Sequence, residues 1–259
     1  MGGVTIYRLG LVSVSFRSSS PEAVLKAAKE AGLSCIEWGS DIHAPCTDEK
    51  RLREIASLQR EEGLTCCSYG TYFRLGQDNP AELKEYINAA RILGTDILRL
   101  WCGTKGSDKY PPEDLEALYD DCRAAAKLAL ESGVTLCMEC HNDTLTDRKE
   151  SALALMEAVN SPSFRMYYQP NQLRTTEENT AYARLMAPYT EHVHVFNWDC
   201  PNGGPLEKYP LADGVSQWTR FLEALPGERT LLLEFMPDDR LESLKTEADA
   251  LRKIAGESR

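Results

Sequence analysis

The chain has 259 residues, of which 42% are hydrophobic and 8% aromatic, as is typical of a soluble globular protein. Its 29 Lys and Arg against 40 Asp and Glu give a formal charge of −11. Nucleic acids and anionic membranes attract clustered Lys and Arg, so this charge argues against both as partners and leaves small polar substrates or proteins. No apolar stretch approaches the roughly 20 residues that span a bilayer, and the N-terminus shows no secretory signal.

The nine cysteines do not suggest a disulfide framework, because their number is odd and several fall inside apolar, strand-like stretches. Cys137 and Cys140 have the C-x-x-C spacing of metal and redox motifs, but no second pair completes a zinc site. In a strand, positions three apart also face opposite sides. We therefore expect reduced, mostly buried thiols in a cytoplasmic protein.

The most regular feature of the chain is a glycine that follows a helix-like stretch and precedes an apolar, strand-like one. It occurs four times, at Gly32, Gly63, Gly94 and Gly133. Glycine readily adopts the left-handed conformation in which helices commonly end. The repeat therefore predicts alternating helices and strands.

Strand-like stretches recur along the whole chain, each followed by a helix-like stretch. They lie near residues 4–15, 33–38, 64–69, 95–101, 134–140, 164–169, 191–197 and 229–235. Parallel strands need helical crossovers and eight of them close a sheet, so the pattern predicts a single α/β domain, a (β/α)8 TIM barrel, over residues 1–259. A doubly wound open sheet is the alternative, but residues 11–16 lack the glycine-rich phosphate-binding turn that usually follows its first strand.

Polar residues end several predicted strands, at the face where such a barrel forms its active site. They are Glu139 and His141 in the fifth strand, His192 and His194 in the seventh, and Glu234 in the eighth. An ionised Glu234 inside an apolar stretch is costly to bury unless it is paired or binds a metal. Carboxylate oxygens and imidazole nitrogens are ordinary ligands of Mn, Mg, Co and Zn, so we favour a divalent metal site.

Each of these residues also has a plainer interpretation. Glu139 and Glu234 could be ion-pair partners of Arg99, if that strand residue points inward. Glu37, which ends the second strand, could bind a substrate hydroxyl or pair with Arg99 equally well. We expect His192 to lie deeper in the core than the site.

Residues outside these strand ends are weaker candidates. His43 lies in a predicted loop, where we expect a surface histidine. Four aromatic residues near strand ends could form an apolar wall for a sugar, although most aromatics at such positions are packing residues: Trp38, Tyr69, Trp101 and Trp198.

Four segments together resemble the metal-bearing strand ends of the xylose isomerase-like TIM barrels in order and approximate spacing. They are residues 139–142, 168–172, 192–195 and 233–234. Residues 210–222 also resemble this superfamily's segment before its last metal-binding Glu. The superfamily includes sugar and sugar-phosphate isomerases and epimerases, hydroxypyruvate isomerase, inositol-catabolism enzymes and an apurinic endonuclease branch. Its members often form dimers or tetramers, so the resemblance makes a homo-oligomer plausible.

The resemblance implies that Glu139, His194 and Glu234 bind a divalent metal, Mn first and otherwise Mg, Co or Zn. In the sixth strand, the family usually has Asp followed three positions later by His, whereas this chain has Gln169 and Gln172. Gln169 can still offer an amide oxygen as the fourth ligand, but without the negative charge it should bind a hard metal less tightly. The residues expected to bind the substrate are Glu37, Arg99, His141 and Gln172.

The implied activity is that of an isomerase or epimerase acting on a sugar, a sugar phosphate or a small hydroxy-carbonyl compound. Glu139 and Glu234 would transfer the proton through an enediolate, whose charge the metal stabilises. The endonuclease branch fits poorly, because the chain is acidic and has only four histidines. The alternative, motivated by Gln169 and Gln172, is a non-catalytic or metal-independent sugar-binding barrel that has lost the metal site.

Overall fold

The computed structural model describes residues 7–201 and 204–256. Eight strands form the barrel: β1 (Tyr7–Val12), β2 (Cys35–Gly39), β3 (Thr65–Leu75), β4 (Ile97–Cys102), β5 (Thr135–Glu139), β6 (Phe164–Tyr168), β7 (Thr190–Val195) and β10 (Arg229–Leu233). All neighbouring pairs are parallel, and β10 pairs with β1 to close the sheet. The predicted (β/α)8 TIM barrel is confirmed.

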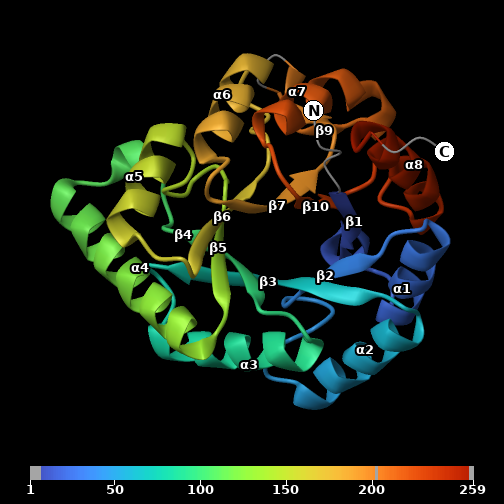
Figure 1. Cartoon of the computed structure of the whole chain (residues 1–259), viewed down its shortest axis with the longest axis horizontal. Coiled ribbons are helices and arrows are strands. Elements are labelled where there is room, and N and C mark those ends of the chain that lie inside the picture. The colour runs from blue at the N-terminus through green and yellow to red at the C-terminus, as the bar shows by residue number, and fades with distance from the viewer. Residues whose placement is uncertain (1–6, 202–203, 257–259) are drawn as a thin grey trace.

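Eight helices form a ring around the strands (Figure 1). They are α1 (Pro21–Glu30), α2 (Glu49–Glu61), α3 (Leu83–Leu93), α4 (Pro112–Ser132), α5 (Lys149–Val159), α6 (Thr176–Met186), α7 (Val215–Ala224) and α8 (Leu244–Ile254). The first four end as the glycine repeat predicts, because Gly32, Gly63, Gly94 and Gly133 have φ values of +70°, +75°, +87° and +67°. None of the helices that the structure describes is long and apolar enough to cross a membrane.

Two strands differ from the prediction. β3 continues to Leu75, because Thr71 Oγ1 donates to the Arg99 carbonyl at 2.7 Å and pairing with β4 resumes at Arg74 after a register shift. The first strand stops at Val12 and passes into a short 3₁₀ helix, Ser13–Phe16. Its predicted residues 4–6 lie outside the described residues.

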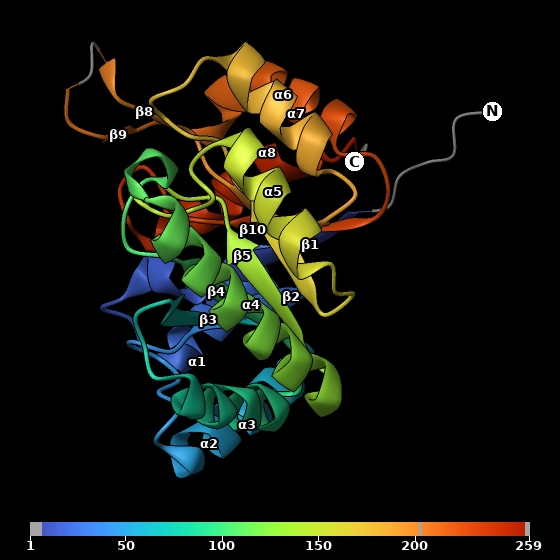
Figure 2. The same cartoon turned by 90° about the vertical axis from the view of Figure 1, so that its left-hand side faces the viewer.

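An antiparallel hairpin, which the sequence did not predict, follows β7. It consists of β8 (Trp198–Asp199) and β9 (Glu207–Lys208), and it extends away from the barrel (Figure 2). Two-residue strands carry too little periodicity to be detected from sequence. The hairpin nevertheless contributes to the cavity described below.

Apolar residues fill two regions, one between the strands and the helices and a smaller cluster that includes Val12, Cys35, Cys137 and Leu232. Cys35, Cys137 and Leu232 each precede a strand-end glutamate by two positions, so each shares a face with it. All nine cysteines are free thiols, and all but two are buried.

His43 corrects one expectation, because it is a buried residue with only 3% of its surface exposed. Its Nε2 lies 3.2 Å from the Ser19 carbonyl, which can only accept, so this nitrogen donates. Nδ1 then accepts from Ser13 Oγ at 3.1 Å. The prediction of a surface position is wrong, because the segment after β1 folds over this loop and provides hydrogen-bond partners for both ring nitrogens.

Candidate metal centre and active site

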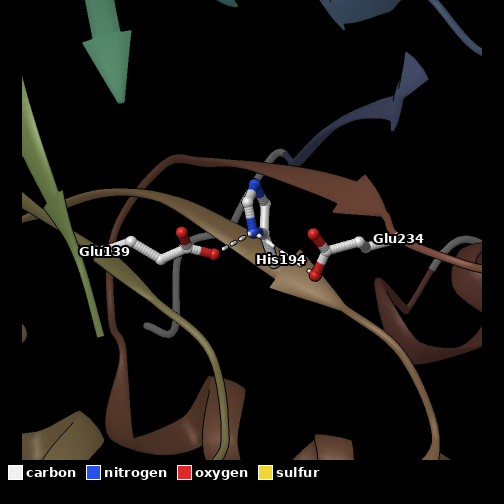
Figure 3. Close-up of side chains that lie close together, drawn as sticks. All are labelled: Glu139, His194 and Glu234. Carbon is white, nitrogen blue, oxygen red and sulfur yellow. Dashed lines mark ion pairs between the residues drawn. The ribbon is translucent and has the colours of Figure 1, made fainter. Parts of the chain in front are cut away.

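Three side chains converge at the carboxyl ends of the strands (Figure 3). Glu139 ends β5, His194 lies near the end of β7, and Glu234 directly follows β10. The His194 Nδ1 atom lies 3.2 Å from Glu139 Oε1 and 3.5 Å from Glu234 Oε2. The two carboxylates thus approach one imidazole nitrogen from different walls of the barrel.

Glu37 and Arg99 extend this cluster on the β2 and β4 side. Arg99 donates from Nε to Glu37 Oε1 at 2.9 Å and from Nη1 to Glu139 Oε2 at 2.6 Å. Glu37 Oε1 also lies 3.4 Å from His194 Nε2, and its Oε2 accepts from Ser68 Oγ at 2.6 Å. Of the three ion pairs of Arg99 that the sequence left open, those with Glu37 and Glu139 are present, and among the described residues none is formed with Glu234. One guanidinium therefore joins two buried carboxylates.

Gly70 on β3 makes room for this arrangement. A Cβ atom at this position would lie 2.7 Å from Glu37 Oε1 and 3.0 Å from Arg99 Nη2. The first distance is shorter than real Cβ contacts and the second is at the tight limit, so a larger residue at position 70 would have to displace the Glu37–Arg99 pair.

The charges set different proton affinities for the side chains of the cluster. Burial by itself lowers the pKa of His194, but Glu234 and Glu37 outweigh it and raise the pKa to about 10. Burial is the largest effect on Glu234 and raises its pKa to about 7. Burial acts on Glu139 in the same direction, but Arg99 and His194 outweigh it and lower its pKa to about 2. The two carboxylates that face His194 therefore differ in their affinity for a proton.

The donor atoms fit a divalent cation. The ligand atoms of Glu139, His194 and Glu234 lie within 4.8 Å of one another. Divalent cations hold such ligands at roughly 2.0–2.6 Å, so ligands on opposite sides of an ion lie roughly 4–5 Å apart. Both His194 ring nitrogens lack a partner with hydrogen-bond geometry, as does the buried Oε1 of Gln169. A bound cation would satisfy one of the two ring nitrogens and could also be met by the Gln169 oxygen.

A cavity of about 350 Å³ opens above these residues. Glu139, Glu234 and Gln169 border it on the charged side. Aromatic and aliphatic side chains form much of the remaining wall: Val14, Tyr72, Trp101, Trp198, Leu206 and Phe235. The cavity can therefore hold a small molecule with polar groups toward Glu139 and Glu234 and carbon atoms toward the aromatic rings.

A match to a family model shows which protein family this chain belongs to. A family model described as xylose isomerase-like TIM barrel matches residues 25–254. The chain belongs to this family. No curated protein sequence matches the chain.

Solved structures of the xylose isomerase-like fold are similar over nearly the whole chain. The probable 3-DHS dehydratase AsbF from Bacillus anthracis has a TM-score of 0.77 and 19% identity, covering 94% of this chain and 98% of that one. A xylose isomerase-like TIM barrel protein from Mycobacterium smegmatis, in complex with magnesium, has a TM-score of 0.72 and 16% identity, covering 98% of each chain. D-psicose 3-epimerase from Clostridium cellulolyticum H10, with D-tagatose, has a TM-score of 0.67 and 13% identity, covering 95% and 98%. At these identities the likeness shows the fold alone.

The other site residues expected from the sequence lie in two places. His141 borders the 350 Å³ cavity, and its Nδ1 donates to the Asn142 carbonyl at 2.7 Å, so a neutral ring keeps Nε2 as an acceptor. Gln172 borders an adjoining cavity of about 410 Å³, which shares Trp198 with the first. His192 lies deeper, as expected, with Nε2 3.2 Å from the Cys67 carbonyl.

The aromatic residues divide in the same way. Trp101 and Trp198 line the cavity, whereas Trp38 and Tyr69 are buried in the core, where Trp38 Nε1 donates to Gln59 and the Tyr69 hydroxyl to the Ala44 carbonyl. Five lining residues were missed by sequence reasoning: Val14, Tyr72, Leu206, Lys208 and Phe235. Phe235 directly follows Glu234 and could have been inferred, whereas Tyr72 and the two hairpin residues depend on tertiary structure.

Proposed function

We propose that this protein is a metal-dependent isomerase or epimerase that moves a proton on the carbon next to a carbonyl group. Its substrate would be a sugar, a sugar phosphate or a small hydroxy-carbonyl compound. One observation carries the proposal: Glu139 and Glu234 approach His194 from different walls at the floor of a cavity. Structural neighbours that include a D-psicose 3-epimerase and an L-ribulose 3-epimerase support this class of reaction.

Glu139, His194 and Glu234 would hold the metal, with Gln169 as the fourth ligand. Manganese is our first choice, with Mg, Co or Zn as alternatives, and a related structure contains magnesium. When bound, a divalent cation supplies Lewis acidity that stabilises negative charge on the substrate oxygens. Because Gln169 is neutral, the ligand set carries one negative charge less than the family's usual set.

The two glutamates would carry the proton. A substrate carbon between them meets one carboxylate on each side, so one glutamate removes the proton and either one returns it. Return to the opposite face of the same carbon gives an epimer, and return to the neighbouring carbon exchanges aldose and ketose. Arg99 keeps Glu139 in place. Of the proposed substrate-binding residues, Arg99 and His141 border the cavity, and Gln172 would serve a substrate that reaches the adjoining cavity. Glu37 is buried behind Arg99 and borders neither cavity, so it would act only through its ion pair with Arg99.

Proton exchange in deuterated water tests the proposal directly. Chelator-treated protein is incubated with Mn, Mg, Co or Zn and a panel of ketoses, aldoses and their phosphate esters, and deuterium uptake and products are followed by NMR. We expect metal-dependent deuterium uptake at the carbon next to the carbonyl, with an epimer or isomer as product. Loss of water from the substrate would instead indicate a dehydratase, the activity named for one structural neighbour. No exchange with any metal would contradict the proposal and favour the sugar-binding barrel.

A further inference from the structure

We propose that Asp239 sets the charge specificity of this site: by binding Lys208 it withholds the accessible cation of the cavity, so that the preferred substrate is uncharged rather than phosphorylated or carboxylated. This inference rests on the proposed function and narrows its substrate class. It follows from the partners of the charged side chains around the cavity.

Two lysine or arginine side chains border the 350 Å³ cavity among the residues that the structure describes, Arg99 and Lys208. Arg99 is 3% exposed, and Glu37 and Glu139 hold its guanidinium. Lys208 Nζ donates to both carboxylate oxygens of Asp239, at 2.6 and 2.5 Å. Both cations of the cavity are therefore already paired with carboxylates.

Nearby cations do not replace them. Arg74 lies against the Trp101 ring, 4.3 Å from its centroid, and donates to the Gly103 carbonyl at 3.0 Å without bordering the cavity. Arg17 is paired with Asp41. In the adjoining cavity, Arg174 lies on a wall that also contains two carboxylates, Asp199 and Asp213.

The surroundings of Lys208 favour carbon atoms over anions. Its Nζ lies 5.0 Å from the centroid of the Phe235 ring, and Phe235 lies 5.4 Å from Trp198. Leu206 borders the same cavity and is 47% exposed. The C–H face of a sugar packs well on such a surface, whereas a phosphate monoester brings a charge of about −1.5 to −2 that needs partners.

Asp239 is well placed to act as a specificity residue because it touches Lys208 without belonging to the metal cluster. It lies five positions after Glu234, in the loop that follows β10, and its φ is +55°. The Lys208–Asp239 pair therefore joins this loop to the β8–β9 hairpin beside the cavity that Lys208 borders. Removing the carboxylate leaves the ammonium available to an anionic substrate.

The test compares a ketose that the enzyme exchanges with the phosphate ester of the same ketose. For the manganese-loaded wild type, we expect kcat/KM for the free sugar to be at least about tenfold higher. Asp239→Asn should raise the ratio of phosphate ester to free sugar about tenfold, and adding Lys208→Met should abolish the gain. Asp238→Asn is the matched control, because its carboxylate contacts Ser243 Oγ and the Arg240 amide instead of Lys208, and it should leave the ratio unchanged.

A second readout does not depend on activity. Calorimetric titration with inorganic phosphate should show binding to Asp239→Asn at least about tenfold tighter than to wild type, weakening as salt is added. Lys208→Met alone should leave the wild-type phosphate affinity unchanged, which serves if Asp239→Asn fails to fold in a thermal melt. Equal or better use of the phosphate ester by wild type, or an unchanged phosphate affinity in folded Asp239→Asn, would overturn the inference. Absence of exchange with every substrate contradicts the proposed function instead, and the phosphate titrations still decide this inference.

Discussion

Two walls of the cavity present the same residue type in different settings. On the β4–β5 wall, Glu139 Oε2 accepts from Arg99 Nη1 and from Trp101 Nε1. On the β10 wall, the Glu234 carboxylate faces His194 at 3.5 Å and accepts no hydrogen bond from any described residue. The comparison shows that residues on neighbouring strands, rather than the glutamates themselves, decide which carboxylate is held by hydrogen bonds and which is not.

The largest effect should come from substituting Glu234, the carboxylate on the β10 wall. Glu234→Gln removes a proton carrier while keeping the shape of the side chain, so substrate proton exchange should fall at least about 10³-fold. The melting temperature should stay close to that of wild type, because no described hydrogen bond to this carboxylate is lost. Deuterium uptake measures the loss, and Glu242→Gln, an exposed glutamate paired with Arg240, is the control. Unchanged exchange with a proven substrate would remove Glu234 from the mechanism.

Removing Arg99 from the β4–β5 wall should mainly lower the stability of the fold. Arg99→Met leaves Glu37 and Glu139 buried without their cation, which should cost about 3–5 kcal/mol in the free energy of unfolding. Urea denaturation measures this cost. Arg123→Met is the matched control, because its ion pairs with Glu116 and Asp120 are exposed and should be worth at most about 1 kcal/mol. A loss no larger than that of the control would show that the buried network does not hold this wall.

A third substitution restores the negative charge that the family usually has at position 169, between the two glutamate walls. Gln169→Asp adds a carboxylate to the cavity that Glu139 and Glu234 border, so affinity for manganese should rise about tenfold or more. Isothermal titration calorimetry measures the affinity. Gln172→Asp is the control, because Gln172 borders the adjoining cavity and should give no comparable gain. Equal effects of the two substitutions would place Gln169 outside the ligand set.

The smallest effect on stability should come from removing the Trp101 indole N–H, one of the two donors to Glu139. Trp101→Phe keeps an aromatic ring in the cavity but removes the indole N–H that Glu139 accepts. A single hydrogen bond to a charged group is worth about 1.5–3 kcal/mol, and Arg99 still holds the same oxygen, so we expect stability to fall by about 1 kcal/mol. Denaturant unfolding measures it. A loss as large as that of Arg99→Met would show that the indole, rather than the guanidinium, is the main partner.

Much of the fold could be predicted from the sequence because its signals are local. Gly32, Gly63, Gly94 and Gly133 end helices in the left-handed conformation, and the strand that follows each of them is mostly buried. The placement of Glu139, His194 and Glu234 at one end follows from the same regularity, since parallel strands bring their carboxyl ends together.

The rest depends on contacts between distant segments. The burial of His43 depends on Ser13 and Ser19, which lie more than 20 positions away. Tyr72 reaches the cavity because β3 continues past its predicted end, after a register shift that no sequence pattern marks. No sequence pattern distinguishes Lys208 or Asp239 from other charged residues. Only the folded hairpin brings them together.

Metal binding tests the central claim most directly. Protein purified without chelator is analysed for its metal content and then, after chelator treatment, titrated with manganese while its melting temperature is followed. We expect close to a single ion per chain and a melting temperature that rises with metal, because the folded cluster binds the cation and the unfolded chain does not. His194→Ala should lose both effects. No metal in the wild type and no thermal shift with Mn, Mg, Co or Zn would contradict the metal centre and favour a sugar-binding barrel.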